Sequence, residues 1–328
     1  MEVNTLEPLF LKPVFHKKIW GGRKLGQMFP YQIPDGKIGE CWAISAHPHG
    51  PSEVENGPYK GKLLNELWDQ APDLFGNPQG KVFPLLTKIL DAEDSLSVQV
   101  HPDNKYALEH EGELGKTECW YIISAEPGSY LIYGDNAQNR EELDHMIETE
   151  DWKHLLKKKP VKTGDFVYVP SGTVHALNKG IVALETQQSS DTTYRLYDYD
   201  RVDAKTGKKR ALHIKQSEAT INIPFVAPKL NIQTKKIGNS EITSYVEPPI
   251  SPFFAVWGEQ IDHDTLPQTH QIGQYTLYSV ISGSGELQIA NQTYSLPLGT
   301  HFIIPAQIKN WSISGDNIHL ISSESAEK

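Results

Sequence analysis

A short β-unit that occurs twice is the feature that most constrains how this chain can fold. Residues 164–170 and 299–305 both read Gly-x5-Pro, and each encloses a five-residue strand-like stretch. Upstream of them, residues 120–132 and 277–289 share a second pattern, strand, glycine turn, strand. Any two β-hairpins share some of this likeness, but two ordered copies favour two β-barrels in tandem.

Other periodic segments support a mainly β chain with a few helices around the first barrel. Helical spacing of apolar residues predicts a helix over residues 61–75 and a helical insertion over residues 136–159. We expect a metal-binding, catalytic domain over residues 1–240 and a degenerate C-terminal domain over residues 241–328, joined near residues 226–244. Short alternating stretches predict strands over residues 95–100, 165–169, 275–281 and 301–304.

The composition of the chain argues against some classes of binding partner. The formal net charge of −10 argues against nucleic acid or an anionic membrane as the main partner. No apolar run approaches the roughly 20 residues that a membrane span requires, and residues 1–12 do not resemble a signal peptide. With only two cysteines no disulfide framework is expected, so we expect a cytoplasmic protein, a monomer or weak homodimer.

Four ligand-type residues have the spacing of one metal centre. The Gly164-x5-Pro turn continues as Pro170-x-Gly172-x2-His175, which places His175 at the start of a return strand. Upstream lie Gln99-x-His101 and then Glu118. Alternate residues of a strand share a face, so Gln99 and His101 point into one barrel together. A histidine in such a turn is more often structural, but four such residues with inward parity favour a divalent cation.

The second copy keeps the residues that shape the turn and lacks the ligands. Gln307 and Asn310 stand where the first copy has Gly172 and His175, and His270 is a single candidate without a partner. We therefore expect the C-terminal barrel to bind no metal. In the first barrel Cys119 adjoins Glu118 and must point to the opposite face, into the core.

These residues resemble a known family. Residues 164–175 are similar to the second cupin motif, and Gln99-x-His101 with Glu118 resembles the first motif of type I phosphomannose isomerases (mannose-6-phosphate isomerases) in the short bacterial form. The resemblance is strong over about residues 10–215 and implies two tandem cupin (jelly-roll) units. Further matching segments are Trp20-Gly-Gly, Glu40-Cys-Trp, Lys88-Ile-Leu-Asp, Ser97-Val-Gln-Val-His-Pro-Asp, Lys116-Thr-Glu-Cys-Trp and Ser190-Asp-Thr-Thr-Tyr-Arg.

The resemblance implies one Zn²⁺ per chain on Gln99, His101, Glu118 and His175. It also implies a role for Arg195 as an active-site arginine, in a pocket lined by Glu185, Lys88 and Lys116.

The chain departs from longer members at two places. Leu177 replaces a tyrosine, and Tyr197-Asp-Tyr-Asp-Arg replaces a Thr-Pro-Lys stretch, where Arg201 falls at the spacing of the lysine. We therefore expect Arg201 to bind substrate.

The implied reaction in mannose metabolism interconverts mannose 6-phosphate and fructose 6-phosphate through an enediol. Glu185 is the candidate base, although it could equally be a structural carboxylate paired with Lys88 or Arg195. Arg195 suits either the phosphate or the enediolate charge. Two rival classes stay open: a cupin oxygenase with iron on the same ligands, and a sugar-binding cupin without catalysis.

Overall fold

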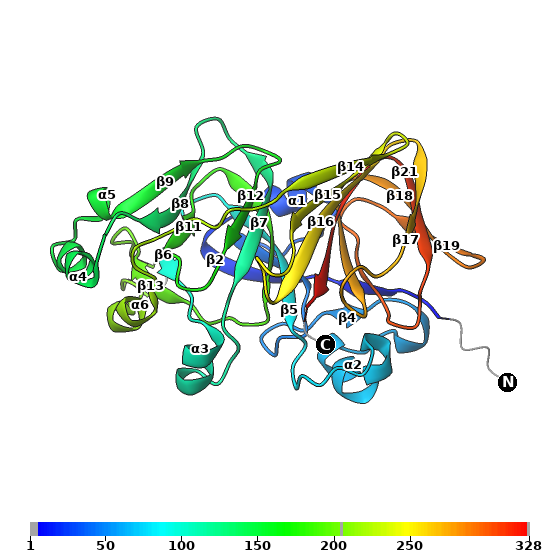
Figure 1. Ribbon diagram of the computed structural model, residues 1–328, viewed down its shortest axis with the longest axis horizontal. Helices are drawn as coiled ribbons and strands as arrows, with labels where there is room; N and C mark the ends of the chain where they lie inside the picture. The colour runs from blue at the N-terminus through cyan, green and yellow to red at the C-terminus, as the bar shows by residue number, and fades with distance from the viewer. Residues whose placement is uncertain (1–5, 204–205, 327–328) are drawn as a thin grey trace.

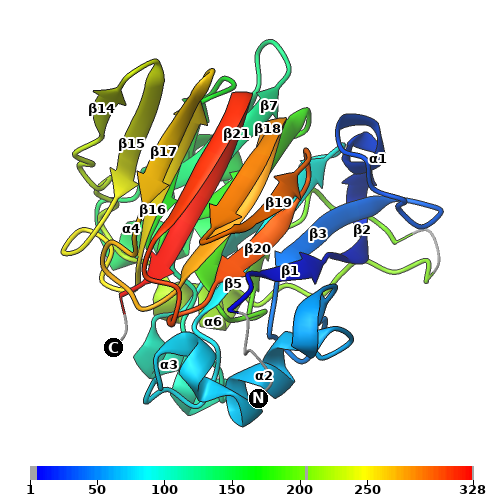
Figure 2. The same ribbon diagram turned by 90° about the vertical axis from the view of Figure 1, so that its right-hand side faces the viewer.

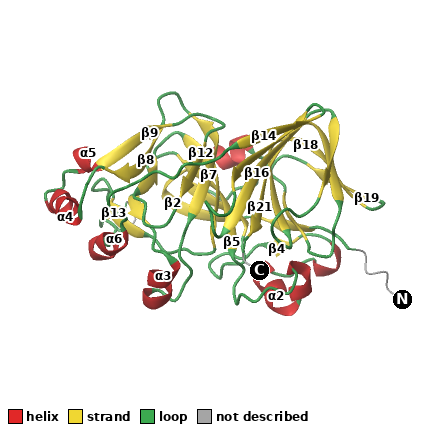
Figure 3. Cartoon of the chain, in the orientation of Figure 1, coloured by secondary structure: helices red, strands yellow, loops and turns green. Residues whose placement is uncertain are grey.

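The computed structural model describes residues 6–203 and 206–326, and β-strands dominate them. Two β bodies lie side by side along the long axis, the first drawn mainly in blue to green and the second mainly in yellow to red (Figure 1). Most helices lie at the periphery of the strands (Figure 3). The expected mainly β fold class is confirmed.

Two sheets form the first body. The six-stranded sheet has the order β10 (Phe166–Val169), β7 (Glu118–Ala125), β12 (Ile181–Gln188), β5 (Leu85–Ala92), β2 (Val14–Gly22) and β3 (Ile38–Ile44). The five-stranded sheet has the order β13 (Tyr194–Tyr197), β6 (Val98–Val100), β11 (His175–Leu177), β8 (Tyr130–Asp135) and β9 (Leu156–Pro160).

A ten-stranded sheet forms the second body, seen face-on in Figure 2. Its main path runs through β14 (Gln233–Ile237), β15 (Ser240–Val246), β16 (Phe254–Ile261), β21 (Trp311–Ser325), β18 (Thr276–Ile289), β20 (His301–Ile304), β1 (Leu9–Lys12) and β4 (Glu53–Val54). β17 (Asp264–Gln268) pairs with β21, and β19 (Gln292–Leu296) pairs with β18.

The two faces of the six-stranded sheet pack against different sheets. One face packs against the ten-stranded sheet in a shared core that includes Cys41, Cys119, Leu277 and Ile303. Each fully buried Leu or Ile there contributes roughly 1.5–3 kcal/mol to folding. Because side chains alternate along a strand, the residues next to Cys119 on β7 face the five-stranded sheet instead. The second body therefore backs the sheet that carries the candidate site, and the core position expected for Cys119 is confirmed.

The expected helical segments are present, with different ends. The first contains α2 (Leu64–Gln70) and the 3₁₀ turn Pro72–Phe75. In the insertion, α4 (Arg140–Glu148) and α5 (Trp152–Leu155) are helical. Its last residues, however, form β9, because pairing with β8 supplies backbone partners that outweigh local helix propensity. The other helices are α1 (Lys24–Met28), α3 (Asn104–His110), α6 (Ile214–Thr220) and the 3₁₀ turn Gly57–Tyr59.

The ten-stranded sheet includes residues that precede residue 240, where we expected the domain boundary. β14 and part of β15 fall within the expected junction, yet both belong to the ten-stranded sheet. β1, at the start of the chain, pairs with β20 and places Leu9 opposite Ile303. Backbone N–H and C=O groups of an edge strand need partners, and β1 supplies them here. No helix of the described residues is long and apolar enough to cross a membrane.

Candidate metal centre and active site

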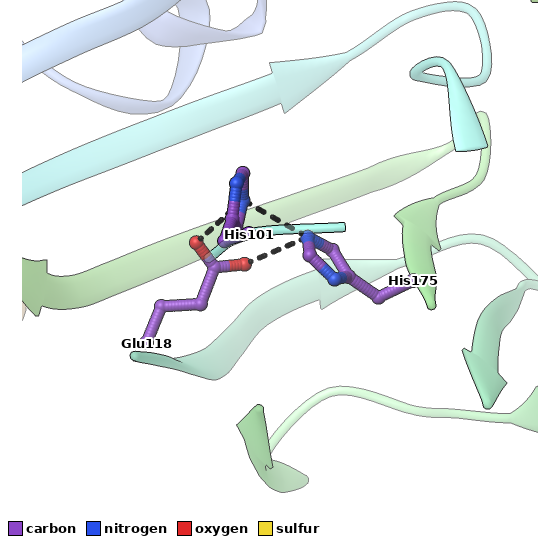
Figure 4. A group of neighbouring side chains, drawn as sticks. All are labelled: His101, Glu118 and His175. Carbon is purple, nitrogen blue, oxygen red and sulfur yellow. Dashed lines mark hydrogen bonds and ion pairs between the residues drawn. The ribbon is translucent and has the colours of Figure 1, made fainter. Parts of the chain in front are cut away.

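Three ligand-type side chains converge inside the first body (Figure 4). Atoms of His101, Glu118 and His175 lie within 4.8 Å of one another, and all three residues are buried. Nε2 of His101 lies 3.4 Å from one oxygen of Glu118, and Nε2 of His175 lies 3.2 Å from the other. The two Nε2 atoms are 3.2 Å apart. The structure therefore brings together three of the four ligands that the sequence predicts.

Local backbone geometry aims His175 at this point. The turn before β11 needs Gly172, whose φ is +81° and whose added Cβ would lie 2.2 Å from Nδ2 of Asn222. The N–H of Gly172 donates to the carbonyl of His101 over 2.8 Å, which ties the turn to the other ligand. Nδ1 of His175 lies 2.8 Å from the carbonyl oxygen of Thr173, an acceptor that requires the proton on Nδ1. Nε2 then presents its lone pair to the centre.

The chemistry of this donor set fits a divalent cation. Burial, reinforced by Lys116, holds the pKa of His101 well below its usual value. Burial also lowers the pKa of His175, against the opposing effect of Glu118. Two neutral imidazoles thus face each other through their Nε2 atoms. Neither oxygen of the fully buried Glu118 accepts a hydrogen bond from any described residue. A cation between these groups would satisfy all of them.

Gln99 lies beside the three residues as the expected fourth ligand. β11 pairs with β6 so that His175 faces Gln99 across the ladder. The amide Nε2 of Gln99 lies 3.4 Å from Nε2 of His175. A half-turn of the amide exchanges its nitrogen and oxygen, which would present an oxygen donor to a metal. Gln99 also lines the cavity beside the centre.

A cavity of about 280 Å³ adjoins this cluster. It is polar and strongly charged, and Lys116, which lines it, has its Nζ 3.6 Å from Glu118. Its lining residues are Lys18, Trp20, Glu40, Lys88, Leu90, Leu96, Ser97, Gln99, Lys116, Glu185, Asp191, Thr193, Arg195 and Arg210.

Neighbouring strands of the six-stranded sheet carry a lysine between two glutamates. Nζ of Lys88 lies 3.6 Å from Glu185 and 3.9 Å from Glu40. Each carboxylate also accepts an indole N–H, Glu185 from Trp120 over 2.8 Å and Glu40 from Trp42 over 2.7 Å. The strand register places these side chains next to one another, because Glu185 on β12 pairs with Lys88 on β5 and with Trp120 on β7.

The two glutamates have opposite proton affinities. Burial disfavours the charged form of Glu40, but Lys88 and Lys18 outweigh burial and lower its pKa to about 2. Burial and the charge of Glu118 raise the pKa of Glu185, despite Lys88. Burial likewise opposes the charge of Lys88, but Glu40 and Glu185 outweigh it and raise the pKa of Lys88. Two carboxylates whose pKa values are shifted in opposite directions can take different chemical roles. Glu40 stays ionised, and Glu185 is able to exchange a proton.

Glu40→Gln is expected to destabilise the protein at pH 7 and to do so less at pH 3. The folded pKa of Glu40, about 2, lies below its ordinary 4.5, so its stabilising effect is complete above pH 4.5 and is lost as the pH falls towards 2. The loss at pH 7 should be on the order of 2–4 kcal/mol, because Lys88 keeps only one carboxylate partner. Urea unfolding of both proteins at pH 7, 5, 4 and 3 measures the difference. A pH-independent difference would contradict the assignment.

The structure brings most of the sequence-predicted site residues together. Glu185, Lys88, Lys116 and Arg195 line the cavity beside the ligands. Arg201 is not among the described residues that line the cavity. Its guanidinium group pairs with Asp198 and donates to the carbonyl of Ser95.

Sequence reasoning missed four further charged residues of the cavity. For Glu40 the signal was available: it adjoins the core residue Cys41, so strand alternation turns it to the site face. The others have no comparable local pattern. The four are Lys18, Glu40, Asp191 and Arg210.

Comparisons with known proteins identify relatives of this chain. The family model described as phosphomannose isomerase type I, catalytic domain, matches residues 9–123, and the model described as mannose-6-phosphate isomerase, cupin domain, matches residues 241–325. The chain is 54% identical over 323 residues to a mannose-6-phosphate isomerase of Streptococcus mutans, covering 98% of this chain and 99% of that one. It is 48% identical to mannose-6-phosphate isomerase ManA of Bacillus subtilis, covering 95% and 97%.

Solved structures show the same likeness. The crystal structure of the mannose 6-phosphate isomerase from Bacillus subtilis matches with a TM-score of 0.92 at 47% identity, covering 97% of this chain and 99% of that one. A putative mannosephosphate isomerase from Archaeoglobus fulgidus shares the fold, with a TM-score of 0.75 at 18% identity over 98% and 99% of the two chains.

Proposed function

The chain belongs to the type I phosphomannose isomerase family, and from that membership we propose that it interconverts mannose 6-phosphate and fructose 6-phosphate. The observation that carries the proposal is that Lys116 and Gln99 join the His101–Glu118–His175 cluster to a charged cavity, which Glu185 and Lys88 also line. An enediol reaction needs an electrophile at two oxygens, a base beside the carbon acid and a grip on the phosphate. This site offers a group for each task.

Zn²⁺, one ion per chain, is the cofactor that we propose. His101, Glu118 and His175 would hold it, with Gln99 as the fourth ligand. When bound, a divalent cation supplies Lewis-acid polarisation of the sugar oxygens. Two imidazoles whose pKa values are lowered by burial, and a buried Glu118 carboxylate that accepts no hydrogen bond from a described residue, support this assignment.

Glu185 is the base in this proposal. The C2–H bond of the aldose breaks and its proton goes to Oε1 of Glu185. The bonding electrons form the C1=C2 double bond, while the π electrons of C1=O move to O1, which takes up a proton to complete the enediol. Glu185 then returns the proton to C1 with the electrons of the C1=C2 π bond, while O2 loses its proton and forms C2=O, which yields the ketose. Oε2 accepts the Trp120 N–H, so Trp120 and Lys88 fix the carboxylate from two sides. A raised pKa strengthens Glu185 as a proton acceptor.

Lys116 and Arg195 are the cavity cations that we assign to the negative charges of the substrate, those on the reacting oxygens and on the phosphate. Lys116 lines the cavity with its Nζ 3.6 Å from Glu118, which supports a role for its ammonium beside the reacting oxygens. Arg195 enters from β13, directly opposite Gln99 in the ladder with β6. Such groups act with most effect where water is scarce. We expect the enzyme to act in the cytoplasm, as a monomer or weak homodimer, on this sugar phosphate and on neither nucleic acid nor a membrane.

A coupled assay with mannose 6-phosphate tests the proposed function. We expect fructose 6-phosphate to form, the activity to disappear after treatment with a chelator, and stoichiometric Zn²⁺ to restore it. Oxygen uptake measured in parallel should be absent; uptake that depends on Fe²⁺ would favour a cupin oxygenase. Tight sugar phosphate binding without turnover in the metal-loaded protein would favour a sugar-binding cupin.

A further inference from the structure

Asp198 holds two arginines on the segment that follows β13. Arg210 donates to its two oxygens over 2.8 and 2.6 Å, through Nε and Nη2. Arg201 donates to Oδ1 over 3.2 Å from Nε and 2.5 Å from Nη2. One carboxylate therefore fixes the position of two guanidinium groups.

The two guanidinium groups differ in what they leave free. Nε and Nη2 of Arg201 bond Asp198, and Nη1 donates to the carbonyl of Ser95, so protein acceptors use all three nitrogens. Arg210 donates to Asp198 from one edge of its guanidinium group, through Nε and Nη2. Its Nη1 donates to none of the described residues, and the side chain lines the cavity. Of this pair, Arg210 has hydrogen-bond donors available to a ligand.

Arg195 lies beside Arg210 and faces the same cavity. Its Nη1 donates to the carbonyl of Ala211 over 2.9 Å, the residue after Arg210. Its Nε is buried and has no acceptor among the described residues. Arg195 and Arg210 thus bring two like charges, which repel each other, to one cavity. An anion between the two guanidinium groups would remove this repulsion.

The balance of charge favours the arginines over the lysines as the anion site. Lys18, Lys88 and Lys116 each lie near a carboxylate, with Nζ 3.1 Å from Glu40, 3.6 Å from Glu185 and 3.6 Å from Glu118, respectively. Within the described residues, Asp198 is the one carboxylate that forms ion pairs with the cluster of Arg195, Arg201 and Arg210, which leaves a net charge of +2.

We propose that Arg195 and Arg210 bind the phosphate group of the substrate, with Asp198 as the positioning residue that presents the free edge of Arg210. This inference rests on the proposed function for the identity of the substrate. A phosphate dianion matches the +2 charge of the cluster, and planar guanidinium groups donate two parallel hydrogen bonds to its oxygens. Arg210 takes the role that residue spacing assigned to Arg201.

Arg210→Ala and Arg201→Ala form a matched pair that tests this site. Both remove an arginine from Asp198, but only the first removes a lining residue of the cavity. For Arg210→Ala we expect KM for mannose 6-phosphate and Kd for fructose 6-phosphate to rise about 10- to 100-fold, as for loss of charged hydrogen bonds. Arg201→Ala should change both by about threefold or less, and Arg210→Lys should recover part of the loss.

Titration calorimetry on the metal-loaded full chain separates this proposal from the isomerase assignment. Arg210→Ala should weaken the binding of both inorganic phosphate and fructose 6-phosphate, whereas its melting temperature should stay close to that of the wild type. Equal losses in the two alanine variants, or undiminished phosphate binding by Arg210→Ala, would overturn the proposal. If the wild type binds these anions but does not isomerise mannose 6-phosphate, the isomerase function fails while the comparison of variants still decides the anion site.

Discussion

Replacing His175 by alanine is expected to remove the bound metal and to lower kcat/KM by about 10³-fold or more, since Lewis-acid stabilisation is worth several kcal/mol and each 1.36 kcal/mol is tenfold. Nε2 of His175 lies 3.2 Å from both Glu118 and His101, so its loss leaves a two-residue remnant of the cluster beside Gln99. The β-fold should persist, because the shared core of the six- and ten-stranded sheets lies on the other face.

Metal content by mass spectrometry, activity and far-ultraviolet circular dichroism measure this outcome together. His270→Ala is the matched control, because His270 lies in the C-terminal body, where Nδ1 bonds Thr276 over 2.8 Å. We expect one tight divalent ion per chain in the wild type and in His270→Ala, and none in His175→Ala. Full metal occupancy in His175→Ala would remove His175 from the ligand set. A second tight ion that disappears with His270 would show a metal site in the C-terminal body.

Glu185→Gln is expected to lower exchange of the substrate C2 proton with solvent by about 10²- to 10⁴-fold, the usual contribution of a positioned general base. The amide keeps the size of the side chain and an acceptor for the Trp120 N–H, but it cannot take the proton. Lys88 keeps Glu40 as a partner at 3.9 Å, which limits the damage to packing. Metal content should remain that of the wild type.

Glu40→Gln provides the comparison for this variant, because Glu40 lies on the other side of the same lysine. Its pKa of about 2 makes Glu40 a poor proton acceptor, so its replacement should lower exchange by about tenfold or less. Deuterium incorporation from D₂O, followed by nuclear magnetic resonance, measures both variants. Unchanged exchange in Glu185→Gln would transfer the role of base to another group of the cavity.

Local rules of the sequence were sufficient to predict the proposed ligand cluster. The pattern Gln99-x-His101 depends only on the alternation of side chains along a strand, and the turn before His175 depends on Gly172 and its positive φ. The same alternation puts Cys119 in the shared core and Glu118 at the site. The mainly β class followed from short alternating segments, because the period of two needs no knowledge of distant contacts.

Only the tertiary structure decided which distant residues share a strand ladder or a carboxylate. Spacing along the chain favoured Arg201 for the substrate, yet Asp198 and Ser95 occupy its donors and Arg210 lines the cavity. In the same way β1 joins the second body, and Lys88 meets Glu40 from another strand. Such pairings depend on which strands become neighbours, and that choice is made by the burial of whole sheet faces, a sum over many residues that no local pattern contains.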